Sequence, residues 1–143
     1  MNVCLKKLDE NAVLPTYATA DSAGADLYAL ASESIPPKET RLIHTGIALQ
    51  IPQGYAGFIY ARSGLATKKG LAPANKVGVI DADYRGEIMV ALYNQSAEER
   101  LVEAGERIAQ LVIAPVVQAA FLPVDSLEDT ARAEGGFGST GKR

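Results

Sequence analysis

One segment, Glu87-Ile88-Met89-Val90-Ala91-Leu92-Tyr93, is apolar almost throughout. Successive side chains of a β-strand point to opposite faces, so the residues of such a segment fall into two sets. One set would be Ile88, Val90 and Leu92, and the other Met89, Ala91 and Tyr93. Because both sets are apolar, the segment predicts a strand that is buried on both sides.

Short apolar runs recur on either side of this segment and are separated by Gly, Pro, Asn and Asp. We expect further strands over Val3–Lys7, Ala25–Ala29, Arg41–Ile51, Tyr55–Ala61, Val77–Ile80, Arg107–Ile113 and Val116–Pro123. The tripeptide Pro52-Gln53-Gly54 predicts a hairpin turn. Many short strands with turns between them predict an all-β barrel or jelly roll.

One short helix is expected at Ser63–Lys69, because Ser63 can cap its N-terminus and Gly70 can end it. The tail Glu134–Arg143 is rich in glycine and hydroxyl residues and cannot form a core, so we expect it to be mobile on its own. The sequence thus predicts one β domain over residues 1–132 and a flexible C-terminal arm over residues 133–143.

Size and composition restrict the function. A chain of 143 residues, 48% of them hydrophobic, fits one domain. A net charge of -3 provides no basic field for a nucleic acid, although local groups could still bind a small phosphate. No apolar run is long enough for a membrane span, and we expect no secretory signal. The single cysteine, Cys4, is expected as a small buried residue on the first strand, which suits a reducing cytoplasm.

The segment Arg62-Ser63-Gly64 follows an expected strand and begins the expected helix. The free N–H groups of a helix N-terminus favour a phosphate, and an arginine adds charge-assisted hydrogen bonds. The alternative is an ordinary helix cap with a surface arginine.

A second polar segment, Asp81-Ala82-Asp83-Tyr84-Arg85-Gly86, joins two apolar runs. The alternative interpretation is a solvated hairpin, since Asp-Tyr-Arg-Gly suits a type I turn. However, Asp81 directly follows the strand ending at Ile80, where a carboxylate would be held rigidly. Such a group can accept a proton from an attacking water.

The C-terminal tail matches part of a P-loop between Gly136 and Lys142. Because Arg143 follows where Ser or Thr is required, and no helix can follow, we reject that interpretation. Either the tail folds over a nucleotide, with Phe137 stacked on a base, or it is a disordered end. We expect a structural or surface role for His44, the only histidine, and no zinc site.

Taken together, five segments resemble the ordered motifs of the trimeric dUTPase family. They are Asp21-Ser22-Ala23-Gly24-Ala25-Asp26-Leu27, Ala61-Arg62-Ser63-Gly64-Leu65, Gly78-Val79-Ile80-Asp81-Ala82-Asp83-Tyr84-Arg85-Gly86, Arg107-Ile108-Ala109-Gln110-Leu111 and Arg132-Ala133-Glu134-Gly135-Gly136-Phe137-Gly138-Ser139-Thr140-Gly141. Ala133 departs from the family's frequent glycine and removes no chemical group. The resemblance implies a β-clip, jelly-roll-like subunit in a homotrimer whose active sites are shared between chains.

The resemblance also implies hydrolysis of dUTP to dUMP and pyrophosphate. Asp81 would deprotonate a water that attacks the α-phosphorus, and Asp26 would contact Mg²⁺ through water. Phosphates would be bound by Arg62, Ser63, Gly64, Gln110, Arg132, Gly138, Ser139 and Thr140. Uracil and deoxyribose would be bound by Asn75, Gly78, Val79, Tyr84 and Phe137.

Two alternatives remain. A dCTP deaminase shares the fold by family resemblance, but it needs an acid/base group at cytosine C4, usually a glutamate, where this chain has Asp81. A non-catalytic regulator could use the same trimer to bind a protein. The presence of Asp81, Arg62 and Gln110 argues against that alternative.

Overall fold

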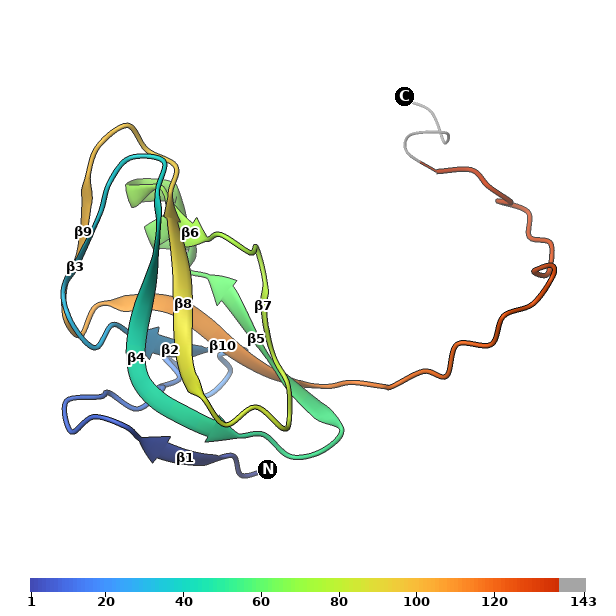
Figure 1. Ribbon diagram of the computed structural model, residues 1–143, viewed down its shortest axis with the longest axis horizontal. Coiled ribbons are helices and arrows are strands. Elements are labelled where there is room, and N and C mark those ends of the chain that lie inside the picture. Colours follow the sequence, from blue (N-terminus) through green and yellow to red (C-terminus); the bar gives the residue numbers. More distant parts are fainter. Residues whose placement is uncertain (137–143) are drawn as a thin grey trace.

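The computed structural model describes residues 1–136, and this part of the chain is almost entirely β-structure (Figure 1). The described part contains ten strands and one short helical segment, η1. In chain order they are β1 (Cys4–Lys7), β2 (Ala25–Tyr28), β3 (Glu33–Ile35), β4 (Thr40–Gln50), β5 (Tyr55–Ala61), η1 (Leu65–Lys69), β6 (Leu71–Pro73), β7 (Gly78–Ile80), β8 (Glu87–Asn94), β9 (Arg100–Val102) and β10 (Arg107–Pro115). The expected all-β class is confirmed.

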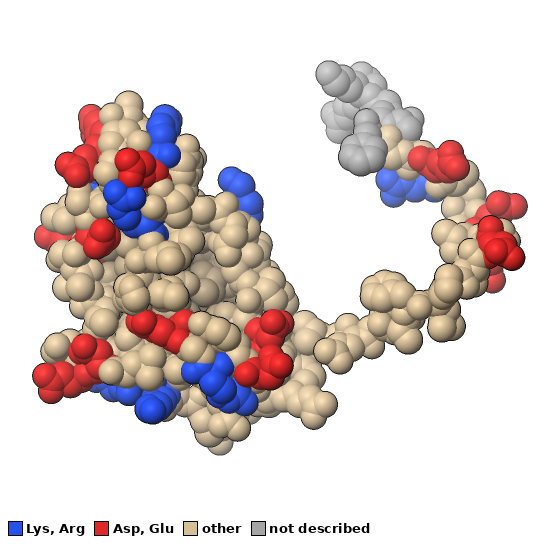
Figure 2. Space-filling view, viewed as in Figure 1, with Lys and Arg blue, Asp and Glu red and all other residues tan. Residues whose placement is uncertain are grey.

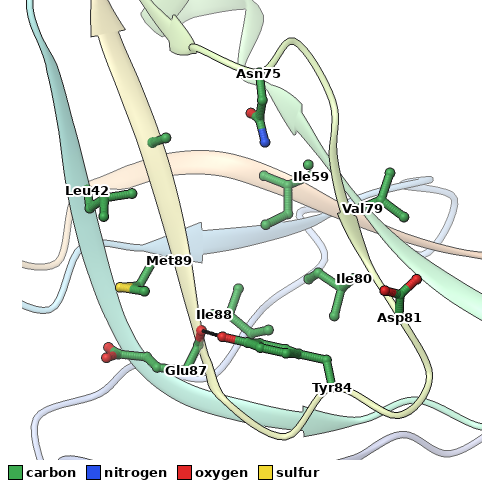
Figure 3. A pocket seen from close by; sticks show the side chains of 12 residues that line it. Leu42, Ile59, Asn75, Val79, Ile80, Asp81, Tyr84, Glu87, Ile88 and Met89 are labelled. Atoms are coloured by element: carbon green, nitrogen blue, oxygen red, sulfur yellow. Dashed lines mark hydrogen bonds between the residues drawn. The ribbon is translucent and has the colours of Figure 1, made fainter.

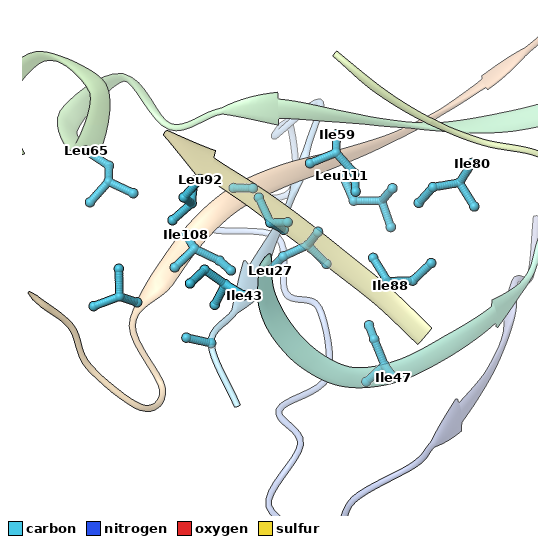
Figure 4. Packing of buried hydrophobic residues seen from close by; sticks show 14 of the residues in the cluster. Leu27, Ile43, Ile47, Ile59, Leu65, Ile80, Ile88, Leu92, Ile108 and Leu111 are labelled. Atoms are coloured by element: carbon cyan, nitrogen blue, oxygen red, sulfur yellow. The ribbon is translucent and has the colours of Figure 1, made fainter. Parts of the chain in front are cut away.

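Two four-stranded antiparallel sheets and one two-stranded sheet make up the body. Their strand orders are β1-β4-β8-β6, β2-β10-β5-β7 and β3-β9. Side chains of both larger sheets form one core, which includes Ile43 and Ile88 from one sheet and Ile59 and Leu111 from the other (Figure 4). Two sheets around a shared core are the arrangement of a jelly-roll-like subunit.

Strand β8 follows the predicted alternation, but only one of its faces is fully buried. Ile88, Val90 and Leu92 are at most 2% exposed. The other face is only half-buried, so the expectation of burial on both sides is wrong. Met89 and Ala91 on this second face border a cavity, which explains the difference.

The segment Pro52-Gln53-Gly54 forms a turn but not the predicted hairpin. Tyr55 N–H donates to the Pro52 carbonyl over 3.2 Å, and Gly54 has a φ of 82°. Strand β4 before the turn pairs with β1 and β8, whereas β5 after it pairs with β10 and β7. The turn therefore carries the chain from one sheet to the other.

The expected helix is present as η1, a single wide turn that Gly70 ends in the left-handed region at φ 69°. Ser63 does not cap it: the N-cap residue is Gly64, and no side chain caps the segment. The Ser63 carbonyl instead accepts a hydrogen bond from the hydroxyl of Thr67 over 2.7 Å.

Two further expectations for side chains and strands are wrong. Cys4 lies on β1 as expected, but it is exposed, because β1 is an edge strand on which only Leu5 packs against the core. The segment Val116–Pro123 forms no strand: beyond Pro115 the described chain leaves the body (Figure 1). Val117 is 92% and Phe121 is 93% exposed, so β-propensity without a partner strand has not formed a sheet here.

Acidic and basic side chains are mixed over the face shown in Figure 2, and no continuous basic surface forms on this face. Within residues 1–136, no helix is long and apolar enough to cross a membrane.

Candidate active site

A cavity of about 280 Å³ opens between β7 and β8 (Figure 3). Five predicted site residues line it. Asn75 comes from the loop before β7, and the third motif supplies Gly78, Val79, Asp81 and Tyr84. The Asn75 side chain points into the cavity from the loop between β6 and β7 (Figure 3). The remaining wall is largely apolar and comes from β4, β5 and β8, with Leu42, Ile59 and Met89 among its residues.

Strand β7 is the outer strand of its sheet and pairs only with β5. An outer strand leaves one row of backbone N–H and C=O groups without a strand partner. Strand β8 lies on the other side of the cavity, but it belongs to the other sheet and does not pair with these backbone groups of β7. The cavity is therefore bordered by a strand edge that can form backbone hydrogen bonds with a flat polar ligand.

Asp81 directly follows β7, at the rim of this cavity. Its carbonyl accepts a hydrogen bond from Tyr84 N–H over 3.2 Å, which closes a turn. The solvated-hairpin alternative is wrong, because β7 and β8 lie in different sheets and do not pair. The exposed carboxylate of Asp81 thus stands where the chain crosses between sheets, beside the cavity.

The ring of Tyr84 forms another side of the cavity (Figure 3). Its hydroxyl donates to the backbone carbonyl of Glu87 over 3.0 Å. Gly86 lies against the ring: a Cβ placed there would lie 2.5 Å from Cζ of Tyr84. The ring is thus held between a backbone acceptor and a residue without a side chain.

Glu87 also links β8 to an irregular part of β4. Its carboxylate accepts hydrogen bonds from Nδ1 of His44 and from the N–H of Gly46, both over 2.8 Å. Burial raises the pKa of Glu87, but these hydrogen bonds and the charge of His44 outweigh it, so the pKa is lowered overall. His44 therefore has a partner that the sequence did not indicate, and the pair supports the expected structural role.

A second group of predicted residues surrounds the buried carboxylate of Asp26 on β2. Nε of Arg62 donates to Oδ1 of Asp26 over 2.8 Å, and a guanidinium nitrogen of Arg107 donates to Oδ2 over 3.3 Å. Asp26 is 6% exposed, so the two arginines neutralise a carboxylate that would otherwise be costly to bury.

Gln110 lies in the same group. On β10 it pairs with Asp26 on one side and with Tyr60 on the other. Its side-chain amide donates to the Ala61 carbonyl over 3.3 Å, and a Cβ on Gly24 would approach its side chain to 3.0 Å. This second group, here called the arginine cluster, comprises Asp26, Arg62, Arg107 and Gln110.

An ion pair without net charge, Lys69–Glu106, lies near Arg62. Nζ of Lys69 lies 2.6 Å from Oε1 of Glu106. Burial raises the pKa of Glu106, but the hydrogen bonds from Lys69 and the Glu103 N–H, with the charges of Lys69 and Arg62, lower it further than burial raises it. Glu106 is therefore held in its charged form beside the cluster.

Asp81, at the rim of the cavity, and the arginine cluster lie near opposite ends of β5. In the β5–β7 pairing Gly57 lies opposite Ile80, so Asp81 is near the N-terminal end of β5, whereas Arg62 follows its C-terminal residue, Ala61. At 3.3 Å per residue, the two positions are about 20 Å apart along the strand. One chain thus contains two separate groups of predicted site residues.

The other predicted residues are in neither group. Ser63 and Gly64 are exposed next to Arg62. Arg132 lies in the extended C-terminal segment, where its Nε donates to the Gly135 carbonyl over 2.7 Å. Phe137, Gly138, Ser139 and Thr140 lie outside the described residues.

The sequence did not single out three residues that the geometry makes prominent. Arg107, Gly86 and Glu87 each contact a predicted site residue. Arg107 and Gly86 lie within the motifs quoted above but were given no role, and a charged residue at the start of an apolar strand was the only signal for Glu87. The partners of the Arg107 and Glu87 side chains are far away in sequence, so spacing could not show the contacts.

Mg²⁺ in proteins is held by oxygen ligands. Residues 1–136 contain no group of three or more Asp, Glu, His or Cys side chains that could hold a metal ion. Both oxygens of Asp26 already accept hydrogen bonds from arginines. Such a set fits an ion that is bound mainly by phosphates of a ligand and contacts the chain through water.

The arrangement of an all-β body with these two groups agrees with the sequence comparison. The family model described as dUTPase matches residues 10–141. The chain belongs to the dUTPase family. A deoxyuridine 5'-triphosphate nucleotidohydrolase of Nautilia profundicola is 51% identical over 142 residues, which cover 99% of this chain and all of that protein. One from Hydrogenobaculum is 49% identical over the full length of both chains.

Solved structures of dUTPases have the same fold as this family member. The dUTPase of Staphylococcus bacteriophage 80alpha, in a mutant form with dUpNHpp, superimposes with a TM-score of 0.93 at 29% identity and covers 99% of each chain. A mutant dUTPase from phage phi11 of S. aureus, described with a structural Mg(II) ion, gives a TM-score of 0.83 at 26% identity. That match covers 90% of this chain and all of the phage chain.

Proposed function

We propose that this chain hydrolyses dUTP to dUMP and pyrophosphate, with Asp81 as the general base. The observation that carries the proposal is the convergence of Asn75, Gly78, Val79, Asp81 and Tyr84 on one cavity of about 280 Å³. Full-length relatives at about 50% identity are deoxyuridine 5'-triphosphate nucleotidohydrolases, and a close structural neighbour holds dUpNHpp.

Uracil recognition rests on the free edge of β7. Uracil presents an acceptor, a donor and an acceptor along O2, N3–H and O4. The backbone of Gly78 and Val79, with the amide of Asn75, can supply the complementary groups. Cytosine has a donor in place of O4 and would leave a polar group unpaired. Sites of this kind discriminate by about 10⁴–10⁵.

Asp81, the proposed general base, lies at the rim of the cavity. With the base on the β7 edge and the sugar against Tyr84, the innermost phosphate emerges beside this carboxylate. Asp81 removes a proton from a water as the water attacks the α-phosphorus, and pyrophosphate leaves. General-base assistance contributes a factor of about 10²–10⁴ in rate. Positioning and charge neutralisation supply the remaining rate acceleration.

The phosphate chain is bound by groups of the arginine cluster and its surroundings. Arg62 provides positive charge, Ser63 and Gly64 provide polar and backbone contacts, and Gln110 provides an amide. Asp26 fixes the guanidinium of Arg62 and contacts Mg²⁺ through water. When bound, Mg²⁺ neutralises charge that develops on the phosphate oxygens.

A separation of about 20 Å between Asp81 and Arg62 is too long for one triphosphate within a single chain. We therefore propose a homotrimer in which the cavity of one subunit faces the arginine cluster of another. The C-terminal segment supports this assembly: Val117, Phe121 and Leu127 are at least 85% exposed on their own chain and need an apolar partner surface.

In this trimer, residues 133–143 form an arm that closes a site built by other subunits. As the arm closes, Gly138, Ser139 and Thr140, with Arg132 just before the arm, would bind the outer phosphates, and Phe137 would stack on the uracil. These assignments rest on the resemblance of the fifth motif.

The deaminase alternative predicts ammonia release from dCTP. One panel tests both: the purified chain with Mg²⁺ is offered each of the four common dNTPs, dUTP and UTP, and pyrophosphate and ammonia are measured. We expect pyrophosphate from dUTP alone, with no ammonia from dCTP. Equal turnover of several nucleotides, or no turnover of dUTP, would refute the proposed function.

A further inference from the structure

The loop between β7 and β8 places Gly86 against the hydroxyl end of the Tyr84 ring. A Cβ built on Gly86 would lie 2.5 Å from Cζ and 2.9 Å from Cε2 of Tyr84. Real Cβ atoms do not approach other atoms so closely, so any side chain at this position must displace the ring. Gly86 does not have a positive φ, so an alanine could adopt its backbone conformation without strain. The ring is therefore what excludes a side chain here.

The hydroxyl at this same end of the ring, the Tyr84 atom nearest to a Cβ on Gly86, is also anchored. The Tyr84 hydroxyl donates to the Glu87 carbonyl over 3.0 Å. Glu87 is itself fixed, because its carboxylate accepts hydrogen bonds from Gly46 and His44 across the β4–β8 pair. The hydroxyl end of the ring is thus confined by Gly86 and by the Glu87 carbonyl, and Glu87 is held in place by β4.

We propose that Gly86 is a positioning residue for sugar selection: the absence of its Cβ lets the Tyr84 ring lie where it excludes a ribose 2′-hydroxyl. The inference rests on the proposed sugar contact of Tyr84. A methyl group at position 86 pushes the ring off its place and changes the space beside the sugar. Gly86 touches no substrate and acts only through Tyr84.

The test compares dUTP with UTP in the full-length protein and in the Gly86→Ala variant. The measured quantity is the ratio of kcat/KM for dUTP to kcat/KM for UTP. We expect this ratio to fall about 10- to 100-fold, the loss typical of a group displaced by about 1 Å. General damage to the fold would lower both values together and leave the ratio unchanged, and that result would overturn the inference.

A double-mutant cycle with Tyr84→Ala shows whether Gly86 acts through the ring. Tyr84→Ala should lower the ratio by itself, and Gly86→Ala should then have no further effect. A full additional effect of Gly86→Ala without the ring would overturn the inference and leave the role of Tyr84 intact. An unchanged ratio in Tyr84→Ala alone would instead refute the sugar contact in the proposed function.

A milder variant covers the case in which Gly86→Ala does not fold. Tyr84→Phe keeps the ring and removes only its hydrogen bond to the Glu87 carbonyl. Loss of one such bond should lower the dUTP-to-UTP ratio about 3- to 10-fold. A ratio equal to that of the unmodified chain would overturn the inference, because the hydroxyl end that Gly86 faces would then have no effect on sugar selection.

Discussion

Nε of Arg62 lies 2.8 Å from Oδ1 of Asp26, although the two residues are 36 positions apart in the chain. The contact joins the end of β5 to the middle of β2 through β10, which pairs with both strands. Because Asp26 also binds Arg107, one buried carboxylate orients two cations. Asp26 therefore holds Arg62 in place within the proposed phosphate site.

Replacing Asp26 with asparagine should weaken both folding and nucleotide binding. The free energy of unfolding should fall by roughly 1–3 kcal/mol, less than for a fully buried pair because both arginines are partly exposed. The Kd for a dUTP analogue should rise, whereas turnover should fall less than in Asp81→Asn. Thermal unfolding and calorimetric titration measure the two effects. Asp83→Asn, at an exposed carboxylate, is the control, and equal effects in both variants would contradict the role of Asp26.

The Glu87 carboxylate should make stability depend on pH in acid. Its pKa is lowered in the folded chain, so its contribution is full above the unfolded pKa and is lost as the pH falls through the folded pKa. We expect Glu87→Gln to melt several degrees lower at pH 7, and the difference should shrink below about pH 4. Melting curves over this range test the prediction. A difference that stays constant with pH would show that the ionised carboxylate is not responsible.

Removing residues 133–143 should abolish most dUTP turnover and leave the assembly unchanged. In the proposed trimer the arm closes the site and is not needed to hold the subunits together. Sedimentation measures the assembly and pyrophosphate release measures the activity. A chain that lacks only Lys142 and Arg143 keeps every residue matched by the family and should be fully active. A truncated protein with full turnover would refute the proposal that the arm closes the active site.

Phe137→Trp would provide a unique fluorophore, because the chain contains no tryptophan. If residue 137 stacks on uracil, its emission should shift when a non-hydrolysable dUTP analogue binds. The same titration with a dCTP analogue is the control. An unchanged spectrum at saturating dUTP analogue would argue against stacking.

Local pattern predicted most of the sheets. Strand β5 has the predicted bounds, because seven consecutive residues suit a strand and Gly54 precedes them. Strands β3, β6 and β9 were missed, because each has three residues and one of them is Glu, Pro or Arg, whereas the equally short β7 lies in the apolar run Val77–Ile80. The prediction of a strand at Val116–Pro123 was wrong for a different reason. The composition of this segment suits a strand, but its own chain offers no partner strand.

The sequence named candidate site residues one by one, but it could not show which of them contact each other. Motif resemblance identified Asp26, Arg62 and Asp81 as candidates. It could not show that Asp26 binds Arg62, or that Asp81 lies at the other end of β5, because both facts depend on strand register. The contact between Tyr84 and Gly86 likewise depends on the path of the loop.

The general-base role of Asp81 is tested most directly by the kcat of Asp81→Asn with dUTP and Mg²⁺. This substitution removes the proton acceptor and keeps the size of the side chain. We predict a loss of about 10²–10⁴ in kcat, with a Kd for a dUTP analogue close to that of the unmodified chain. A variant that releases pyrophosphate at nearly the original rate would contradict the mechanism.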